Sequence, residues 1–189
     1  ETVKRDKLKE YFSVPNILSY FRLILIPVYL YTYFNARTDE DYLKAALVIA
    51  VSGLTDALDG FIARHFNQIT EWGKLIDPVA DKLTLASIAL SLVLRFPLMG
   101  AVFVLYLAKE GYMLIMGAVM LRRGYRMDGA QWYGKVCTAV TYAVMLSLLV
   151  FPGMSRRMSN SLIGVCLAVT AMAFIGYVNF YHRVRKTRR

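Results

Sequence analysis

Long apolar stretches alternate with short polar ones along the chain. Six of them are long enough to cross a bilayer as helices, because about 20 apolar residues span its hydrocarbon core. They cover approximately residues 14–33, 42–66, 73–94, 98–121, 132–150 and 159–181. Charged clusters, prolines or glycines separate them. The pattern therefore predicts an all-α integral membrane protein with six transmembrane helices.

The two ends of the chain are polar and basic. Residues 1–12 mix lysines, arginines and acids with a few apolar side chains. This mixture predicts a short amphipathic helix on the membrane surface, with a solvated, frayed terminus as the alternative. The first residues are too highly charged for a cleavable signal peptide. We expect the membrane domain to cover residues 13–183 and a basic cytoplasmic tail to cover residues 184–189.

Composition supports a membrane protein and gives it an orientation. The chain is 57% hydrophobic and carries a formal net charge of +10. A soluble nucleic-acid-binding protein would share the charge but not the long apolar stretches, so we expect no nucleic-acid partner. The positive-inside rule predicts that both termini and the basic cluster at residues 122–126 are cytoplasmic. We expect the membrane to be a bacterial cell membrane. Cys137 and Cys166 lie in apolar stretches and are expected to be buried thiols.

Two pairs of aspartates interrupt the second and third apolar stretches. Asp56 and Asp59 are three residues apart and Asp77 and Asp81 are four apart, so each pair shares one helix face. If the two helices face each other, the four carboxylates converge at the cytoplasmic side. They would repel one another unless hard cations such as Mg²⁺ or Mn²⁺ neutralised them. Ionisable groups inside a membrane segment indicate a functional site.

Small and basic residues accompany the first pair. Gly60 and Ala63 lie on or near the same face and leave room for a ligand beside the helix backbone. Arg64 has a planar fork suited to a phosphate or diphosphate. The constellation predicts a site for a metal-bound diphosphate. The structural alternative is that the small residues serve helix packing and the acids form ion pairs.

The spacing of these residues matches a known signature. The pattern D-x2-D-G-x2-A-R-x8-G-x3-D-x3-D, from Asp56 to Asp81, resembles that of the CDP-alcohol phosphatidyltransferase family. The resemblance implies transfer of a phosphatidyl group from CDP-diacylglycerol to an alcohol, with release of CMP, by a homodimeric enzyme. It implies that Asp56, Asp59 and Asp77 hold two divalent ions, and that Asp81 completes the metal site and acts as general base.

The resemblance also implies residues that contact CDP-diacylglycerol. The stretch from Pro15 to Arg22 is similar to the P-N-x-L-[ST]-x-x-R segment of phosphatidylglycerophosphate and cardiolipin synthases. That segment lies beside the nucleotide in such enzymes. The contacts expected on this basis, together with those from the signature, are Asn16, Ser19, Arg22, Gly60, Ala63, Arg64, Thr70 and Gly73.

The alcohol acceptor is indicated by fewer residues. Lys109-Glu110 stands where phosphatidylglycerophosphate synthases have Arg-Glu, and the segment from Gly134 resembles their G-K-x-K-T with Cys137 in place of the second lysine. This favours glycerol 3-phosphate, whose phosphate Lys109, Arg126 and Lys135 would bind; the alternative is that these cations snorkel to the interface. A cardiolipin synthase using phosphatidylglycerol is the second hypothesis, followed by enzymes using inositol phosphate or serine.

A hypothesis of another class is a membrane transporter or a non-catalytic relative. Transport would require charged groups along several spans, reaching both faces of the membrane. The signature acids instead gather at one face, and all four aspartates are present. The pattern therefore favours an enzyme.

Overall fold

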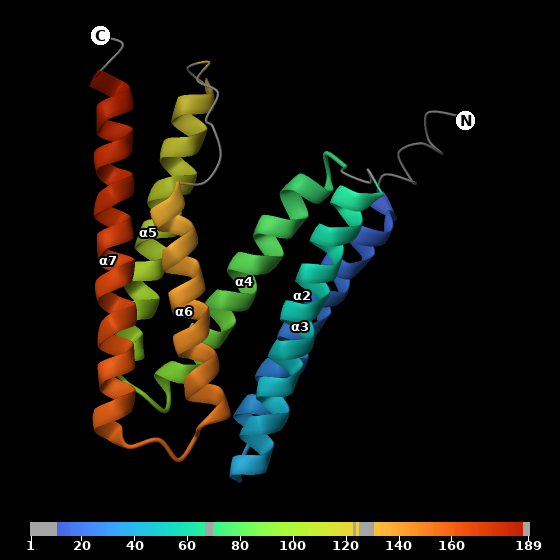
Figure 1. Cartoon of the computed structure of the whole chain (residues 1–189), viewed down its shortest axis with the longest axis vertical. Coiled ribbons are helices and arrows are strands. Elements are labelled where there is room, and N and C mark those ends of the chain that lie inside the picture. The colour runs from blue at the N-terminus through green and yellow to red at the C-terminus, as the bar shows by residue number, and fades with distance from the viewer. Residues whose placement is uncertain (1–10, 67–69, 123, 125–130, 187–189) are drawn as a thin grey trace. The chain divides into compact units, whose positions relative to one another are not determined.

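The described part of the chain consists of helices and short connections. The computed structural model describes residues 11–66, 70–122, 124 and 131–186. These residues form six helices, labelled as in Figure 1: α2 (Val14–Phe34), α3 (Asp39–His65), α4 (Gly73–Val93), α5 (Met99–Arg122), α6 (Trp132–Val150) and α7 (Arg156–Lys186). Most of the interfacial helix predicted at residues 1–12, the candidate residue Arg126 and the end of the predicted tail lie outside the described residues.

Five of the six helices are long and apolar enough to cross a membrane, which identifies an integral membrane protein. The exception is α4, which the sequence pattern predicted as the third span. Its 21 residues would extend about 31 Å, enough for a bilayer core. The first turns of α4 carry Lys74, Asp77, Asp81 and Lys82, however, and these charges interrupt the long apolar stretch that a transmembrane helix needs. The residues that give α4 its chemistry therefore also weaken its transmembrane signal.

The helix boundaries agree with the predicted stretches except at the start of α3 and at both ends of α7. The acids at residues 39–41, expected in a loop, form the first turn of α3. Thr38 caps this helix: its hydroxyl accepts a hydrogen bond from the Asp41 amide, and the Asp41 carboxylate accepts one from the Thr38 amide. This capping box satisfies amides that the first turn leaves unpaired. The last helix begins at Arg156, before the predicted start of the sixth span, and continues to Lys186, beyond its predicted end.

The chain divides into two compact units, which are described separately. The first, Glu1–Ser91, contains α2, α3 and nearly all of α4. In it α2 and α3 pack side by side along their length (Figure 1). Rings of Tyr33 and Tyr42 join them, with centroids 5.4 Å apart. The buried hydroxyl of Tyr29 on α2 forms a 2.6 Å hydrogen bond with that of Ser91 on α4. These contacts tie the three helices of the first unit together.

The second unit, Leu92–Arg189, contains α5, α6 and α7. Both α5 and α6 pack against α7, and a cluster of Met120, Tyr177 and Tyr181 is buried among them. Helices α6 and α7 approach closely where Tyr133 packs on Gly176 and the Tyr177 hydroxyl lies over Gly134. Cys137 and Cys166 are buried free thiols, as the sequence predicted.

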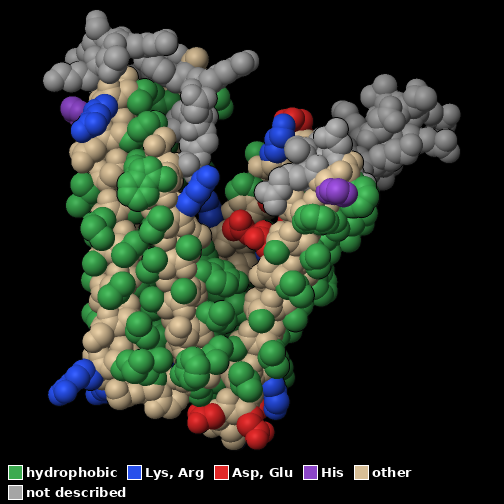
Figure 2. Space-filling view, viewed as in Figure 1, with side chains coloured by type: hydrophobic (Ala, Val, Ile, Leu, Met, Phe, Trp, Pro, Cys, Tyr) green, Lys and Arg blue, Asp and Glu red, His purple; other side chains and the backbone are tan. Residues whose placement is uncertain are grey.

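The outer surfaces of both units are apolar. Large hydrophobic side chains are exposed on every helix, including Ile24 on α2, Leu54 on α3, Leu114 on α5 and Met172 on α7. Figure 2 shows hydrophobic side chains spread over the lengths of the helices on the face in view, with many of the charged side chains near the helix ends. Such a surface is favourable in lipid and unfavourable in water, so it agrees with a membrane location.

Candidate functional site

One face of α2 carries three polar side chains at successive positions of the helix repeat. Asn16, Ser19 and Arg22 are each three residues apart and therefore lie in a row. All three are buried, with at most 1% of each residue exposed. Pro15 stands in the first turn of α2, where its missing amide proton is tolerated. A buried polar row on an otherwise apolar helix needs partners from neighbouring elements.

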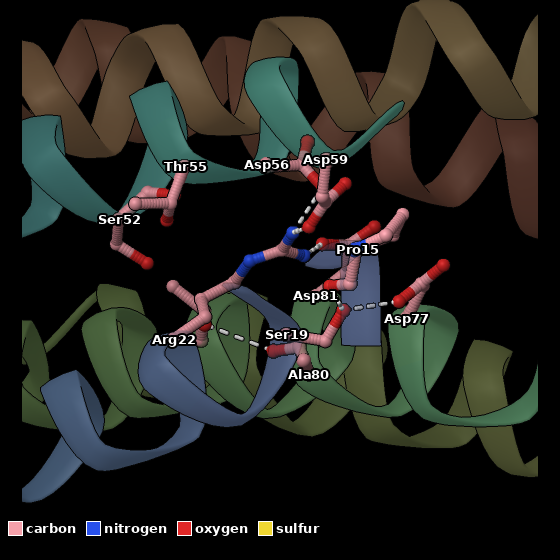
Figure 3. Close-up of polar contacts among 11 residues, drawn as sticks. Pro15, Ser19, Arg22, Ser52, Thr55, Asp56, Asp59, Asp77, Ala80 and Asp81 are labelled. Carbon is pink, nitrogen blue, oxygen red and sulfur yellow. Dashed lines mark hydrogen bonds and ion pairs between the residues drawn. The ribbon is translucent and has the colours of Figure 1, made fainter. Parts of the chain in front are cut away.

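Arg22 finds its partners among the signature aspartates. Its Nη2 atom lies 2.7 Å from Asp56 Oδ1 and also pairs with Asp59 Oδ2. Its Nη1 atom pairs with Asp81 Oδ1. Figure 3 shows the guanidinium group pointing toward these carboxylates, which come from α3 and α4. One cation of α2 thus joins the two aspartate pairs.

Ser19 holds the fourth aspartate. Its hydroxyl donates a hydrogen bond that Asp77 Oδ1 or the Pro15 carbonyl oxygen, 3.1 Å away, can accept (Figure 3). With Arg22 one turn further on, this face of α2 contacts all four signature aspartates. The four carboxylates therefore lie around one point of the first unit, as the spacing predicted.

The carboxylates differ in their access to the surroundings. The side chain of Asp59 is 5% exposed, whereas those of Asp56 and Asp81 are 48% and 50% exposed. Arg22 and Asp59 therefore form the buried floor of the cluster, and Asp56 and Asp81 lie at its open side. A substrate can reach the open carboxylates without displacing the helices.

A second group of predicted residues is connected by hydrogen bonds at the start of α4. Asn16 Nδ2 donates a 3.0 Å hydrogen bond to Thr70 Oγ1, and the Gly73 amide donates one of 2.9 Å to the same oxygen. A side chain at Gly73 would collide with this group, because its Cβ would lie 2.6 Å from Asn16 Oδ1. Three of the residues expected to contact CDP-diacylglycerol thus touch one another, one turn from Ser19.

Tyr20 contributes a contact that sequence reasoning missed. The indole Nε1 of Trp72 donates a 2.6 Å hydrogen bond to the Tyr20 hydroxyl. The ring of Trp72 also meets that of Tyr11 edge to face, with centroids 5.3 Å apart. These contacts fix the segment that leads into α4. The signal in the sequence was weak, because a tyrosine inside an apolar stretch is common near a membrane interface.

The small and basic residues of the signature lie in the last turns of α3. Gly60 and Ala63 are half-buried, and Arg64 follows in the same helix. The position of the Arg64 side chain is outside what the structure describes, so its predicted phosphate contact stays a prediction. His65 is exposed, and its ring stacks on that of Phe61.

The predicted acceptor residues belong to the second unit. Lys109 is 3% exposed, and its Nζ lies 2.8 Å from Glu110 Oε1. The two side chains therefore form an ion pair although the residues are adjacent in the sequence. Lys135 is exposed near the start of α6. Arg126 lies outside the described residues.

The aspartates have the donor chemistry of a site for a hard divalent cation. Four carboxylates supply oxygen ligands, and one guanidinium leaves their negative charge in excess. Across residues 11–66, 70–122, 124 and 131–186, however, no three acidic, histidine or cysteine side chains stand ready-made as ligands of one ion. Arg22 stands among the carboxylates instead. The carboxylate oxygens are donors of the kind that a divalent cation prefers, so the donor set fits such an ion by its chemistry.

A cluster of carboxylates inside a helical membrane protein indicates a functional site. A sequence profile of the CDP-alcohol phosphatidyltransferase family matches residues 12–177. The chain belongs to this family and is a phosphatidyltransferase of phospholipid biosynthesis.

Curated relatives cover most of the chain. A CMP-forming cardiolipin synthase of Streptomyces coelicolor is 34% identical over 87% of this chain and 75% of its own length. A probable phosphatidylglycerophosphate synthase of Mycobacterium tuberculosis is 31% identical over 90% of this chain and 81% of its own. The CDP-diacylglycerol–glycerol-3-phosphate 3-phosphatidyltransferase of Escherichia coli is 32% identical over 89% and 94%. These names share the reaction type and differ in the acceptor.

Proposed function

We propose that the chain transfers a phosphatidyl group from CDP-diacylglycerol to glycerol 3-phosphate and releases CMP. The observation that carries the proposal is the convergence of Asp56, Asp59, Asp77 and Asp81 on one face of α2. Relatives named for transfer to glycerol 3-phosphate or for phosphatidylglycerophosphate synthesis support this acceptor.

Divalent cations are part of the proposal. Asp56, Asp59, Asp77 and Asp81 would hold them, with two Mg²⁺ or Mn²⁺ ions as the expectation. When bound, such ions supply positive charge that neutralises the diphosphate and the departing CMP. The support is the donor chemistry of the four carboxylates and their excess of negative charge.

Asp81 is proposed as the group that takes the proton of the acceptor hydroxyl. Its side chain is half exposed, so an alcohol can approach it, while Arg22 holds one of its oxygens. As the proton passes to Asp81, the acceptor oxygen forms a bond to the phosphorus of the phosphatidyl group. The bond from this phosphorus to the bridging oxygen breaks, and CMP leaves with that oxygen.

The CDP moiety is proposed to bind beside the turn that starts α4. Asn16, Thr70 and Gly73 already form a connected group there, and a glycine at position 73 leaves room for the Asn16 and Thr70 side chains. Gly60 and Ala63 at the end of α3 would let the diphosphate approach that helix, and Arg64 would pair with it. The acyl chains would remain in the bilayer, against the apolar outer faces of the helices.

The orientation and assembly of the enzyme are also proposals. The positive-inside rule favours a cytoplasmic site and cytoplasmic termini, in a bacterial cell membrane, because the basic ends and the cluster at residues 122–126 would then share one side. A homodimer is what family resemblance leads us to expect.

A cardiolipin synthase that uses phosphatidylglycerol is the second candidate. Lys109 is neutralised by Glu110, and Cys137 is buried with its thiol 3.8 Å from the Thr170 hydroxyl. Lys109 therefore offers no free positive charge to an acceptor phosphate, and Cys137, which replaces a lysine of the related segment, offers none either. This favours an acceptor whose phosphate is less charged. The Streptomyces relative carries the corresponding name.

The test is CMP release from CDP-diacylglycerol by detergent-purified protein, with each acceptor supplied separately in Mg²⁺ or Mn²⁺. We expect release with glycerol 3-phosphate, and a fall of roughly 100-fold or more in the Asp81→Asn variant. Glu71→Gln is a matched control, because its side chain is 82% exposed and pairs with Lys74. Release with phosphatidylglycerol alone would replace the proposed acceptor, and an active Asp81→Asn variant would refute the role of Asp81.

A further inference from the structure

Arg22 is a permanent positive charge placed inside the aspartate cluster. A guanidinium group cannot lose its proton in a protein, so its charge must be balanced wherever it is buried. The side chain of Arg22 is 2% exposed, and both of its terminal nitrogens are paired with carboxylates. These carboxylates come from two helices, α3 and α4, while Arg22 belongs to α2 (Figure 3).

This arrangement leaves Arg22 badly placed for a direct contact with substrate. To reach a diphosphate, the guanidinium would have to leave carboxylates that already satisfy Nη1 and Nη2. Its third donor, Nε, is buried and has no hydrogen-bond partner among the described residues. The family resemblance gave Arg22 a place beside the nucleotide, whereas its contacts here are with Asp56, Asp59 and Asp81.

A guanidinium in this position has two opposite effects on the carboxylates. Without another cation, it reduces their mutual repulsion and draws α3 and α4 toward α2. For a divalent cation that needs the same oxygens, it is a competitor of like charge. A nearby positive charge in a poorly hydrated site lowers the affinity for a second one.

We propose that Arg22 is a positioning residue that holds the aspartate cluster together before a divalent cation binds, and that its charge weakens the binding of that cation. The inference rests on the proposed function, because it assumes that the four aspartates bind the cation. A purely structural role for Arg22 would predict weaker or unchanged cation binding when its charge is removed, whereas this inference predicts tighter binding. Removing the charge of Arg22 should destabilise the cation-free protein and yet tighten cation binding.

The measurement is a titration of the detergent-purified full chain with Mn²⁺ alone, followed by the electron paramagnetic resonance signal of free Mn²⁺. Thermal unfolding in EDTA gives the stability of the cation-free protein. Neither readout requires substrate or turnover. Asp77→Asn serves as the check that the titrated ion occupies the aspartate cluster, because it removes one carboxylate from the cluster.

Three variants separate charge from shape. Arg22→Gln removes the charge, and we expect a lower unfolding temperature in EDTA together with Mn²⁺ binding that is tighter by roughly tenfold. Arg22→Lys keeps the charge but loses the fork that spans several carboxylates, so we expect a lower unfolding temperature and a dissociation constant within about threefold of wild type. Lys74→Gln removes an exposed charge that pairs with Glu71, and it should change neither quantity substantially.

The outcomes distinguish this inference from the proposal on which it rests. If the wild-type chain binds Mn²⁺ and Arg22→Gln binds it more weakly or equally, the inference is refuted while the metal site stands. If Arg22→Gln does not fold, Arg22→Lys decides: a tenfold weaker affinity overturns the inference, and an affinity near wild type supports it. If the wild-type chain binds no Mn²⁺ that depends on Asp77, the metal site itself is refuted, and the inference with it.

Discussion

Gly73 is the residue at which the site has the least room. A Cβ atom there would lie 2.6 Å from Asn16 Oδ1 and 2.9 Å from Thr70 Oγ1. Asn16 is buried, so its side chain cannot turn away without losing its hydrogen bond to Thr70. The requirement for glycine at this position of the signature therefore has a steric cause in this chain.

We expect Gly73→Ala to raise the KM for CDP-diacylglycerol by about tenfold, because one buried hydrogen bond is lost or bent. The change in kcat should be smaller, since the aspartates are untouched. Steady-state CMP release at varied CDP-diacylglycerol concentration measures both quantities. Gly164→Ala is the matched control, because an added Cβ there meets nothing within 4 Å. An unchanged KM in a folded Gly73→Ala variant would show that this turn does not bind the nucleotide.

Residue spacing predicted how the aspartates lie on their helices, but it did not predict which groups contact Arg22. The intervals between Asp56 and Asp59 and between Asp77 and Asp81 fix which helix face each occupies, so their convergence could be foreseen. The partners of Arg22 could not, because they depend on how α2 packs on α3 and α4. One part of the structural alternative holds: the acids do form ion pairs, and these pairs build the site.

At the scale of helices, the contact of α6 with α7 depends on two glycines facing two tyrosines. A Cβ at Gly134 would lie 2.0 Å from the Tyr177 hydroxyl oxygen, and one at Gly176 would lie 3.0 Å from the Tyr133 ring. Small residues let membrane helices approach closely, and this close approach replaces the hydrophobic driving force that lipid removes. The pairing joins the two helices near the buried Tyr177 and Tyr181.

Gly134→Ala should lower the free energy of unfolding by roughly 1–3 kcal/mol, because the overpacked helices must shift. Tyr177→Phe removes the hydroxyl that collides, so the double variant should lose less than the sum of the two single variants. Thermal unfolding in detergent of all four proteins gives the coupling. Strict additivity would mean that Gly134 and Tyr177 do not meet in the folded chain.

Five of the six stretches predicted as transmembrane helices are long and apolar enough to cross a membrane in the structure, and α4 is the exception. The boundaries of α2, α5 and α6 fall within about two residues of the expected stretches, within the usual scatter of assigned helix ends. The early start of α3 required the capping box at Thr38, a local hydrogen-bond pattern that polarity alone describes as a loop. In α4 the charged residues of the candidate site lie within the helix itself, and they lower the hydropathy by which a transmembrane helix is recognised.

At the scale of the whole molecule, the sequence determines the reaction type more firmly than the acceptor. The signature lies in one continuous stretch, from Asp56 to Asp81, and the family match extends over residues 12–177. The acceptor instead depends on a few cations of the second unit, of which Lys109 is already paired with Glu110. Relatives with different acceptors differ by only a few per cent in identity to this chain. Overall similarity therefore cannot choose between them, whereas an assay with separate acceptors can.

We propose that the aspartate cluster carries out phosphatidyl transfer with the help of a divalent cation. The most direct measurement is CMP release from CDP-diacylglycerol by wild type, Asp77→Asn and Asp39→Asn, each with EDTA and then with Mn²⁺ restored. Asp39 is an exposed acid in the first turn of α3 and serves as the matched control.

We predict that EDTA abolishes release by the wild-type chain and that Mn²⁺ restores it. Asp77→Asn should lose roughly 100-fold or more of the activity, because a ligand of the cation is removed, while Asp39→Asn should stay near wild type. Release that persists in EDTA, or an Asp77→Asn variant as active as Asp39→Asn, would contradict the central claim.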